Sequence, residues 1–300
     1  MEIETLPEND LSIRDDARWN LLQRKATEVR VLQAFTLFRQ HSIEPVLIKG
    51  LAAAQFYPAS KLRSSIDIDL AVSKADFEAA TDIARSDEAN GLAIDLHREL
   101  RHLDTVDWDD LYQNTRELQL GENVSARVLR PEDHLRVMSV HWLTDGGSNK
   151  DRLWDIYYGI ANRPPDFDWD RFLNVVDSRR RRWLVCAIGL ASHYLGLDLA
   201  DTPVANAKDD IPSWLTRTVE REWENEVRYM PLHVSLGDRK LLWAQIMKRL
   251  RPNPIWATVD MAGSFDANTQ IFYQMGSIFK RSIPAYQRVS AVLTGSKVNE

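Results

Sequence analysis

The sequence predicts an α+β protein in which a small mixed sheet with covering helices is followed by an all-helical region. Short apolar runs bounded by glycine, proline or polar residues alternate with helical patterns over residues 1–130. Helical periodicity dominates residues 131–300, and eight of the ten tryptophans lie there. We therefore expect a mixed α/β domain with an N-terminal helix over residues 1–130, and a helical domain over residues 131–300.

The first part of the chain contains its predicted elements in alternating order. Apolar residues at helical spacing predict one long helix over residues 15–42. Gly50 ends the first strand, and Pro58 ends a short alanine-rich helix because proline disfavours helix in the residue before it. The predicted strands are 46–48, 66–72, 92–97 and 124–129, the predicted helices are 51–56 and 74–85, and residues 104–120 are expected to hold a helix and then a strand.

The composition limits the classes of partner. The formal net charge is −6 without a basic bias, so a nucleic-acid partner is not expected. No apolar run is long enough to span a bilayer, and the acidic N-terminus lacks a signal-peptide pattern. The single cysteine, Cys186, excludes an internal disulfide and is expected in the core. We expect a cytoplasmic protein with no membrane partner.

Three aspartates are the candidate metal ligands. Asp67 and Asp69 are two positions apart in a predicted strand, so both side chains project from one face, and they repel unless a cation lies between them. Asp95 lies on the predicted strand 93–97, and pairing of the two strands would bring the three carboxylates together. Such oxygen ligands suit Mg²⁺ bound together with substrate phosphates. The pattern favours metal-assisted transfer of a phosphate-bearing group.

Residues around the first two aspartates are candidates for phosphate contacts. Gly50 would let the backbone approach phosphate oxygens at the start of a predicted helix. Lys49 and Arg63 would neutralise phosphate charge. Lys49 fits a surface residue equally well, and an ion pair with a carboxylate such as Asp67 is the competing interpretation for Arg63.

Four more residues bear on the predicted site. Ser64 lies beside Arg63 in the connector that leads to the second strand. Lys150 and Arg152 follow a glycine-containing loop in the helical part, where they could reach a triphosphate on domain closure or simply begin a solvated helix. For His97 we expect a structural hydrogen-bonding role, since that is the commoner role of a histidine in a strand.

The order of these motifs resembles a known family, the uncharacterised nucleotidyltransferase family of the polymerase-beta superfamily. The motifs that carry the resemblance are, in chain order, Ile48-Lys49-Gly50, Tyr57-Pro58, Arg63, Asp67-Ile68-Asp69-Leu70 and Ile94-Asp95-Leu96-His97. The resemblance extends to about residue 160. It implies a small mixed-sheet nucleotidyltransferase domain followed by a helical domain, with the active site between them.

The resemblance also implies an activity of EC 2.7.7 type. A nucleoside monophosphate would move from a nucleoside triphosphate, with ATP the expected donor, to an acceptor, and pyrophosphate would be released. Asp67 and Asp69 would be Mg²⁺ ligands, and Asp95 a ligand or a general base. Some relatives occur near genes for ribosomally made peptides, including lasso peptides, and others near polysaccharide genes, so that the contexts of the family suggest very different acceptors. The expected acceptor is therefore a hydroxyl or a phosphate on a small molecule or on a modified peptide.

Two other functions fit parts of the sequence. The Gly-Ser pair of the wider superfamily is here Gly50-Leu51, so the serine that would contact phosphate is missing. This fits a non-catalytic module that binds nucleotide, although the presence of all three carboxylates argues against it. A sugar-nucleotide glycosyltransferase could use the Asp-Ile-Asp motif, but such enzymes usually place a longer α/β nucleotide domain before it.

Overall fold

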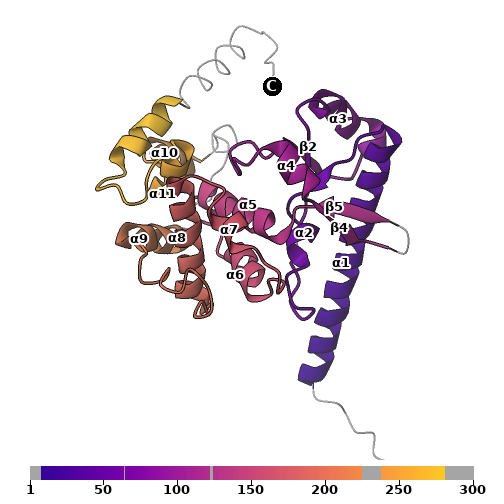
Figure 1. Cartoon of the computed structure of the whole chain (residues 1–300), viewed down its shortest axis with the longest axis horizontal. Helices are drawn as coiled ribbons and strands as arrows, with labels where there is room; N and C mark the ends of the chain where they lie inside the picture. Colours follow the sequence, from indigo (N-terminus) through magenta and orange to yellow (C-terminus); the bar gives the residue numbers. More distant parts are fainter. Residues whose placement is uncertain (1–7, 64, 122–123, 225–237, 281–300) are drawn as a thin grey trace, which may run out of the picture. The chain divides into compact units, whose positions relative to one another are not determined.

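The structure is a computed structural model that describes residues 8–63, 65–121, 124–224 and 238–280 (Figure 1). The chain divides into two compact units, each of which is made of two separate segments of the sequence. Unit 1 comprises Met1–Met138 and Asp155–Val176, and unit 2 comprises Ser139–Trp154 and Asp177–Glu300. The predicted domain boundary near residue 130 stays a prediction.

Unit 1 contains a sheet and the helices that accompany it. Its elements are α1 (Glu8–Gln40), β1 (Val46–Leu47), α2 (Leu51–Ala54), β2 (Ile68–Val72), α3 (Phe77–Ala84), the 3-10 helix η1 (Asp87–Ala89), β3 (Ile94–Arg98), α4 (Trp108–Gln113), β4 (Arg116–Gln119), β5 (Ser125–Val128), the first half of α5 (Pro131–Thr144), most of α6 (Leu153–Ala161), and α7 (Trp169–Leu173). The predicted α+β class, with a mixed sheet followed by a helical region, is confirmed.

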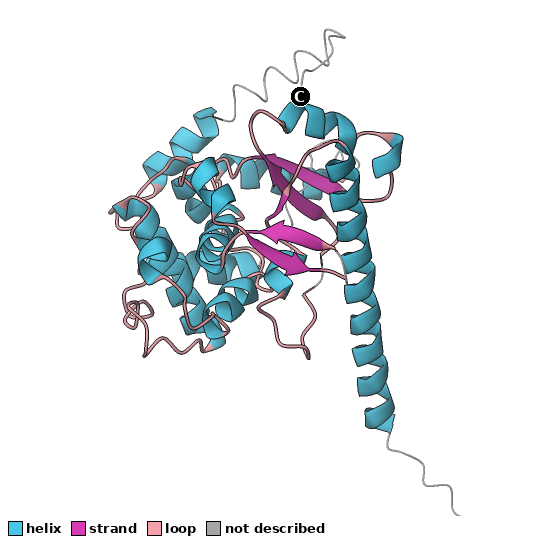
Figure 2. Cartoon of the chain, turned by 45° about the vertical axis from the view of Figure 1, so that its right-hand side comes forward, coloured by secondary structure: helices cyan, strands magenta, loops and turns pink. Residues whose placement is uncertain are grey.

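The five strands form one mixed sheet in the order β3-β2-β1-β5-β4. Figure 2 shows the strands of this sheet in magenta. Strand β2 pairs in parallel with β3, and β1 pairs in parallel with β5. The pairs β1–β2 and β4–β5 are antiparallel. In the register of β2 against β3, Asp69 lies directly opposite Asp95.

Helix α1 packs against the sheet through its C-terminal half. Phe35 is fully buried in one apolar cluster with Leu70 of β2 and Val128 of β5. The N-terminal half runs past the sheet (Figure 2), and Leu21 and Leu22 are exposed there. The apolar periodicity therefore predicted the helix, although α1 begins at Glu8 and not at residue 15 and ends at Gln40 and not at residue 42. The periodicity could not indicate which part of the helix covers the sheet.

Strand β2 begins two residues later than predicted. Ile66 and Asp67 form an exposed bend, and the Ile66 carbonyl accepts a hydrogen bond from Arg30 Nη1 at 3.1 Å instead of joining the sheet. The backbone ladder begins where Ile68 N–H donates to the Ala93 carbonyl at 3.0 Å. Asp67 consequently lies just outside the strand that carries Asp69.

Helices are the regular secondary structure of unit 2 in the part that the structure describes. Its elements are the second half of α5, the first two residues of α6, α8 (Ser178–Leu195), α9 (Ser213–Glu224), α10 (Arg239–Leu250), α11 (Pro254–Asp260) and a helix over residues 271–280. Cys186 is buried on α8, as predicted, and burial raises the pKa of its thiol to about 12. Among the described residues of the whole chain, no helix has the length and apolar character needed to cross a membrane.

Gly50 marks the turn out of β1 into α2. Its φ of +62° lies in the left-handed region, which side chains with a Cβ rarely adopt. A Cβ at this position would also lie 3.3 Å from Ser65 Oγ. The positive φ and the close approach of Ser65 both favour glycine at this position.

We predict that Gly50→Ala lowers the free energy of unfolding by more than the roughly 1–2 kcal/mol expected from the left-handed conformation alone. Gly91→Ala is the matched control, because Gly91 has a φ of +85° but no atom within 4 Å of the point where a Cβ would lie. Urea unfolding of both variants measures the difference. Equal losses would show that crowding against Ser65 contributes nothing.

Candidate metal and nucleotide site

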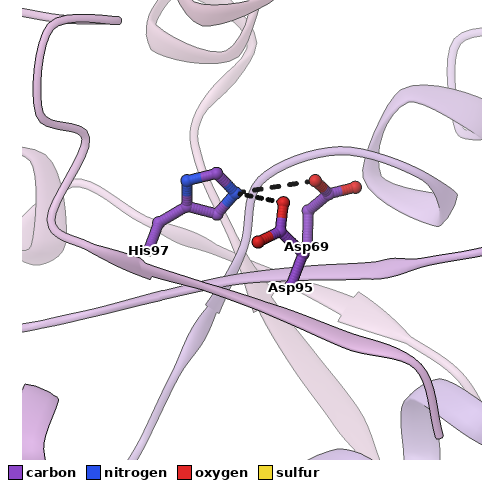
Figure 3. A group of neighbouring side chains, drawn as sticks. All are labelled: Asp69, Asp95 and His97. Carbon is purple, nitrogen blue, oxygen red and sulfur yellow. Dashed lines mark ion pairs between the residues drawn. The ribbon is translucent and has the colours of Figure 1, made fainter. Parts of the chain in front are cut away.

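Three side chains with metal-binding atoms converge on the paired strands β2 and β3. The ligand atoms of Asp69, Asp95 and His97 all lie within 4.8 Å of one another. His97 Nε2 is 3.2 Å from Asp95 Oδ2 and 3.6 Å from Asp69 Oδ1 (Figure 3). Asp69 and Asp95 face each other across the parallel pair, and His97 follows Asp95 by two residues on the same face of β3. The strand register therefore creates the cluster.

The cluster fits a cation. His97 Nε2 is buried without an aligned hydrogen bond, although two carboxylate oxygens lie beside it. Such a nitrogen lacks the partner that buried polar atoms normally have. Carboxylates suit Mg²⁺ and Mn²⁺, whereas imidazole adds a preference for transition metals. Asp69 and Asp95 are thus compatible with the predicted Mg²⁺, and all three side chains together with Mn²⁺.

Lys49 is buried and pairs with the central aspartate of the cluster. Its Nζ lies 2.7 Å from Asp69 Oδ1, and both side chains are almost entirely shielded from solvent. Burial opposes ionisation of Asp69, but interactions with His97 and Lys49 more than offset it and lower its pKa to about 2. Asp69 is consequently ionised at neutral pH, and Lys49 is not a surface residue.

The other two members of the cluster have pKa values shifted in opposite directions. Interaction with His97 lowers the pKa of Asp95, against the opposing effect of its partial burial. Burial lowers the pKa of His97, but the neighbouring Asp69 and Asp95 raise it by more, so that the net shift is upward. A proton that enters the cluster therefore resides on His97 rather than on a carboxylate.

Several predicted residues lie outside this cluster. Asp67 is exposed in the bend before β2, where its carbonyl accepts a hydrogen bond from Ser65 Oγ at 2.9 Å. Its role as a metal ligand stays a prediction. Ser64 lies outside the residues that the structure describes. Gly50 precedes α2 as expected, but this helix has only four residues, so its dipole would contribute little to phosphate binding.

Arg63 forms a buried ion pair with Asp155 of α6. Its Nε and Nη2 each lie 2.9 Å from a carboxylate oxygen of Asp155, and Tyr57 donates to the same carboxylate at 2.7 Å. The interpretation of Arg63 as an ion-pair residue is thus supported, although its partner is Asp155 and not Asp67. Arg63 Nη1 is buried without a hydrogen-bond partner. The predicted phosphate contact of Arg63 stays a prediction.

Lys150 and Arg152 belong to unit 2. Lys150 Nζ lies 5.2 Å from the ring centroid of Trp223, a cation–π distance, and the Arg152 amide donates to Asn149 Oδ1 at 3.3 Å. Their predicted contacts with a triphosphate, and an active site between two domains, stay predictions.

Sequence reasoning undervalued His97. We expected a structural histidine, whereas the structure places its Nε2 between the two carboxylates of the cluster. The signal was the spacing of two residues from Asp95, which places both side chains on one strand face. The burial of Lys49 against Asp69 had no comparable signal, because it depends on the antiparallel pairing of β1 with β2.

Comparison with known proteins identifies one family. Residues 3–87 match the family described as uncharacterised nucleotidyltransferase. The matched segment contains Lys49, Gly50, Asp67 and Asp69, and it ends before Asp95. The family recognised from the sequence motifs is thereby confirmed over this segment. The match supports a transferase activity in general and implies a nucleoside triphosphate substrate. No curated protein and no solved structure gives a significant match to the chain.

We predict that Asp69→Ala lowers the free energy of unfolding by about 3–5 kcal/mol, because it leaves the Lys49 ammonium buried without a partner. The double variant Lys49→Met/Asp69→Leu should regain most of this loss, since it removes both charges and keeps the volume filled. Urea unfolding of wild type, single and double variants tests the pair. A double variant no more stable than the single one would contradict this account.

We also predict that Mn²⁺ affinity rises with pH across the raised pKa of His97. Below that pKa the imidazolium cannot ligate a metal, and deprotonation frees Nε2 as pH rises. Asp69 and Asp95 are already ionised in this range and contribute no slope. The measurement is free Mn²⁺ by electron paramagnetic resonance between about pH 6 and 8.5, a range that starts near the usual pKa of a histidine and extends upward because the shift of His97 is upward.

His97→Gln should remove this pH dependence, and His41→Gln, a change at an exposed histidine after α1, should retain it. The same slope in wild type and His97→Gln would show that another group controls metal binding.

Proposed function

We propose that this chain, whose residues 3–87 match a nucleotidyltransferase family, is a metal-dependent nucleotidyltransferase of EC 2.7.7 type. Its donor is a nucleoside triphosphate, with ATP the first candidate, and its acceptor is a hydroxyl or phosphate on a small molecule or a modified peptide. The observation that carries the proposal is the parallel register of β2 and β3. This register sets Asp69, which lies inside the segment that carries the family match, beside Asp95, which lies outside it.

The proposed reaction is an in-line displacement. An acceptor oxygen forms a bond to the α-phosphorus as the bond to the bridging oxygen breaks, pyrophosphate leaves, and a hydroxyl acceptor loses its proton. Asp69 and Asp95, together with Asp67, would hold Mg²⁺, which when bound supplies charge neutralisation at the phosphates and lowers the pKa of the attacking hydroxyl. The low pKa of Asp69 means that protons do not compete for this ligand at neutral pH.

The pKa shifts also divide the roles within the cluster. The lowered pKa of Asp95 makes it a weak base, which favours its role as a ligand over that of proton acceptor. His97 has a raised pKa, and of the three side chains its pKa lies nearest to neutral pH, where a general base is most effective. We therefore assign proton transfer to His97 if the acceptor is a hydroxyl.

Binding of nucleotide without catalysis is the second candidate function. Lys49 Nζ contacts Asp69 Oδ1, the same oxygen that faces His97. A cation at this position would have to share that oxygen with the ammonium or displace it. If the cation displaces the ammonium, Lys49 is free to contact the phosphates of the bound nucleotide. If the two share the oxygen, Lys49 stays on Asp69, which is the arrangement that favours binding without catalysis.

A thermal-shift experiment with ATP, GTP, CTP and UTP, with and without Mg²⁺, tests the nucleotide site. We expect one triphosphate to raise the melting temperature only when metal is present. A ligand at a hundredfold excess over its Kd stabilises the folded state by about 2.7 kcal/mol. If none of the four triphosphates gives a metal-dependent shift, the proposed function is overturned.

Asp67→Asn and Asp95→Asn should each reduce that shift strongly. The Asp95 side chain is 57% exposed, and Asp67 lies in an exposed bend. Because Lys49 pairs with Asp69, neither change leaves Lys49 without its partner. Asp82→Asn on the exposed side of α3 is the matched control and should behave as wild type. Pyrophosphate release over a broad acceptor panel then separates the two candidate functions. A wild-type protein that binds triphosphate and releases none would be the binding module.

A further inference from the structure

A pocket of about 630 Å³ lies between α1 and the connector that leads into β2. Its walls come from three segments of unit 1, namely residues 21–30 of α1, residues 51–54 of α2 and described residues of the connector between 59 and 66. A volume of this size is within the range of roughly 300–1,000 Å³ typical of small-ligand sites. The cluster of Asp69, Asp95 and His97 contributes no residue to it.

The charged residues that line this pocket are all cations. They are Arg24, Arg30, Lys61 and Arg63, and no aspartate or glutamate is among the described lining residues. Arg30 donates to the carbonyls of Ser65 and Ile66 and to a hydroxyl, none of which carries a formal charge. Arg24 and Arg63 already pair with carboxylates, those of Glu28 and Asp155. The guanidinium of Arg30 is thus the charge at this pocket that an anionic group would neutralise.

Arg63 supplies a second, independent indication of an anionic ligand. Its side chain is 4% exposed, and its Nε and Nη2 are both occupied by Asp155. The bidentate geometry directs Nη1 away from that carboxylate, and Nη1 is buried with no hydrogen-bond partner. A buried donor of a charged group without an acceptor is destabilising, and an anion admitted through the pocket wall would supply one.

The remaining walls are largely apolar. Leu21, Ala26, Leu51, Ala54, Leu62 and Ile66 line the pocket. Leu21 and Ile66 are 58% and 79% exposed, an unfavourable condition that an apolar ligand would relieve. The polar triphosphate of a nucleotide would gain nothing from such walls. The combination fits a molecule that has an apolar body and an anionic group.

We propose that this pocket holds the acceptor of the nucleotidyl transfer, and that the acceptor is a small molecule with a phosphate or carboxylate on an apolar body. The proposal rests on the proposed function and leaves its reaction unchanged. The anionic group of the acceptor would hold the molecule in the pocket and would not itself react. Ser65 lines the pocket, and its Oγ donates to the carbonyl of Asp67. An acceptor held here is thus next to the segment that leads into the strand of Asp69.

Isothermal titration calorimetry of the full chain with hexyl phosphate, hexanoate and hexanol tests the pocket without metal or nucleotide. We expect at least one of the two anions to bind and hexanol to bind at least about tenfold more weakly, which corresponds to about 1.4 kcal/mol. The two anions distinguish a phosphate from a carboxylate anchor. Hexanol binding equal to that of both anions would overturn the proposal.

Two variants of exposed lining residues, each with a matched control on the same helix, locate the binding. Ala26→Trp fills the pocket and should weaken binding of the anion by about tenfold or more, whereas Val29→Trp, outside the pocket, should not. Arg24→Gln should weaken it by about threefold or more, whereas Lys25→Gln should not. Arg24 and Lys25 both contact Glu28, but only Arg24 lines the pocket. Equal effects within each pair would overturn the assignment.

The thermal-shift experiment with triphosphates separates this proposal from the proposed function. A metal-dependent triphosphate shift without binding of either anion would overturn the acceptor pocket alone. Anion binding without any triphosphate shift would overturn the proposed function, and with it the role of the pocket as an acceptor site. Competition between hexyl phosphate and the metal–triphosphate complex would show that the pocket takes the donor instead.

Discussion

The parallel pairing of β2 with β3 is the constraint on which the candidate site depends. Side chains alternate between the two faces of a strand, so a shift of one residue in register would place Asp69 and Asp95 on different faces. The same strand carries Ile68, Leu70 and Val72 into the apolar core beneath α1. Burial of those residues is incompatible with a shifted register. The hydrophobic core thus determines the positions of the carboxylates, although it contains none of them.

Electrostatic balance explains how a buried carboxylate is tolerated at this position. Asp69 loses solvation, and Lys49 and His97 compensate for that loss through their proximity. Lys49 is a cation and His97 can become one, so both can balance the charge of Asp69 before any metal binds. A divalent cation must then compete with an ammonium and with a proton. Such competition makes metal affinity dependent on pH and on the position of Lys49.

A second buried ion pair, between Arg63 and Asp155, joins the connector that precedes β2 to helix α6. Asp155 of α6 accepts hydrogen bonds from Arg63 and Tyr57, and Asn162 Nδ2 donates to the Phe56 carbonyl. These contacts hold both ends of that connector. They account for the return of residues 155–176 to unit 1, and they fix one wall of the basic pocket.

The sequence by itself was enough to predict the mixed sheet, the long first helix and the resemblance to the family that residues 3–87 match. It also singled out the candidate ligands Asp67, Asp69 and Asp95. These features depend on local patterns, namely alternation, helical periodicity and the order of short motifs. Tertiary structure decided what the aspartates contact. His97 joins the cluster through strand register, Lys49 through the pairing of β1 with β2, and Asp155 reaches Arg63 from 92 residues away. Partners so far apart in sequence are brought together only by folding, and no local pattern encodes which carboxylate meets which cation.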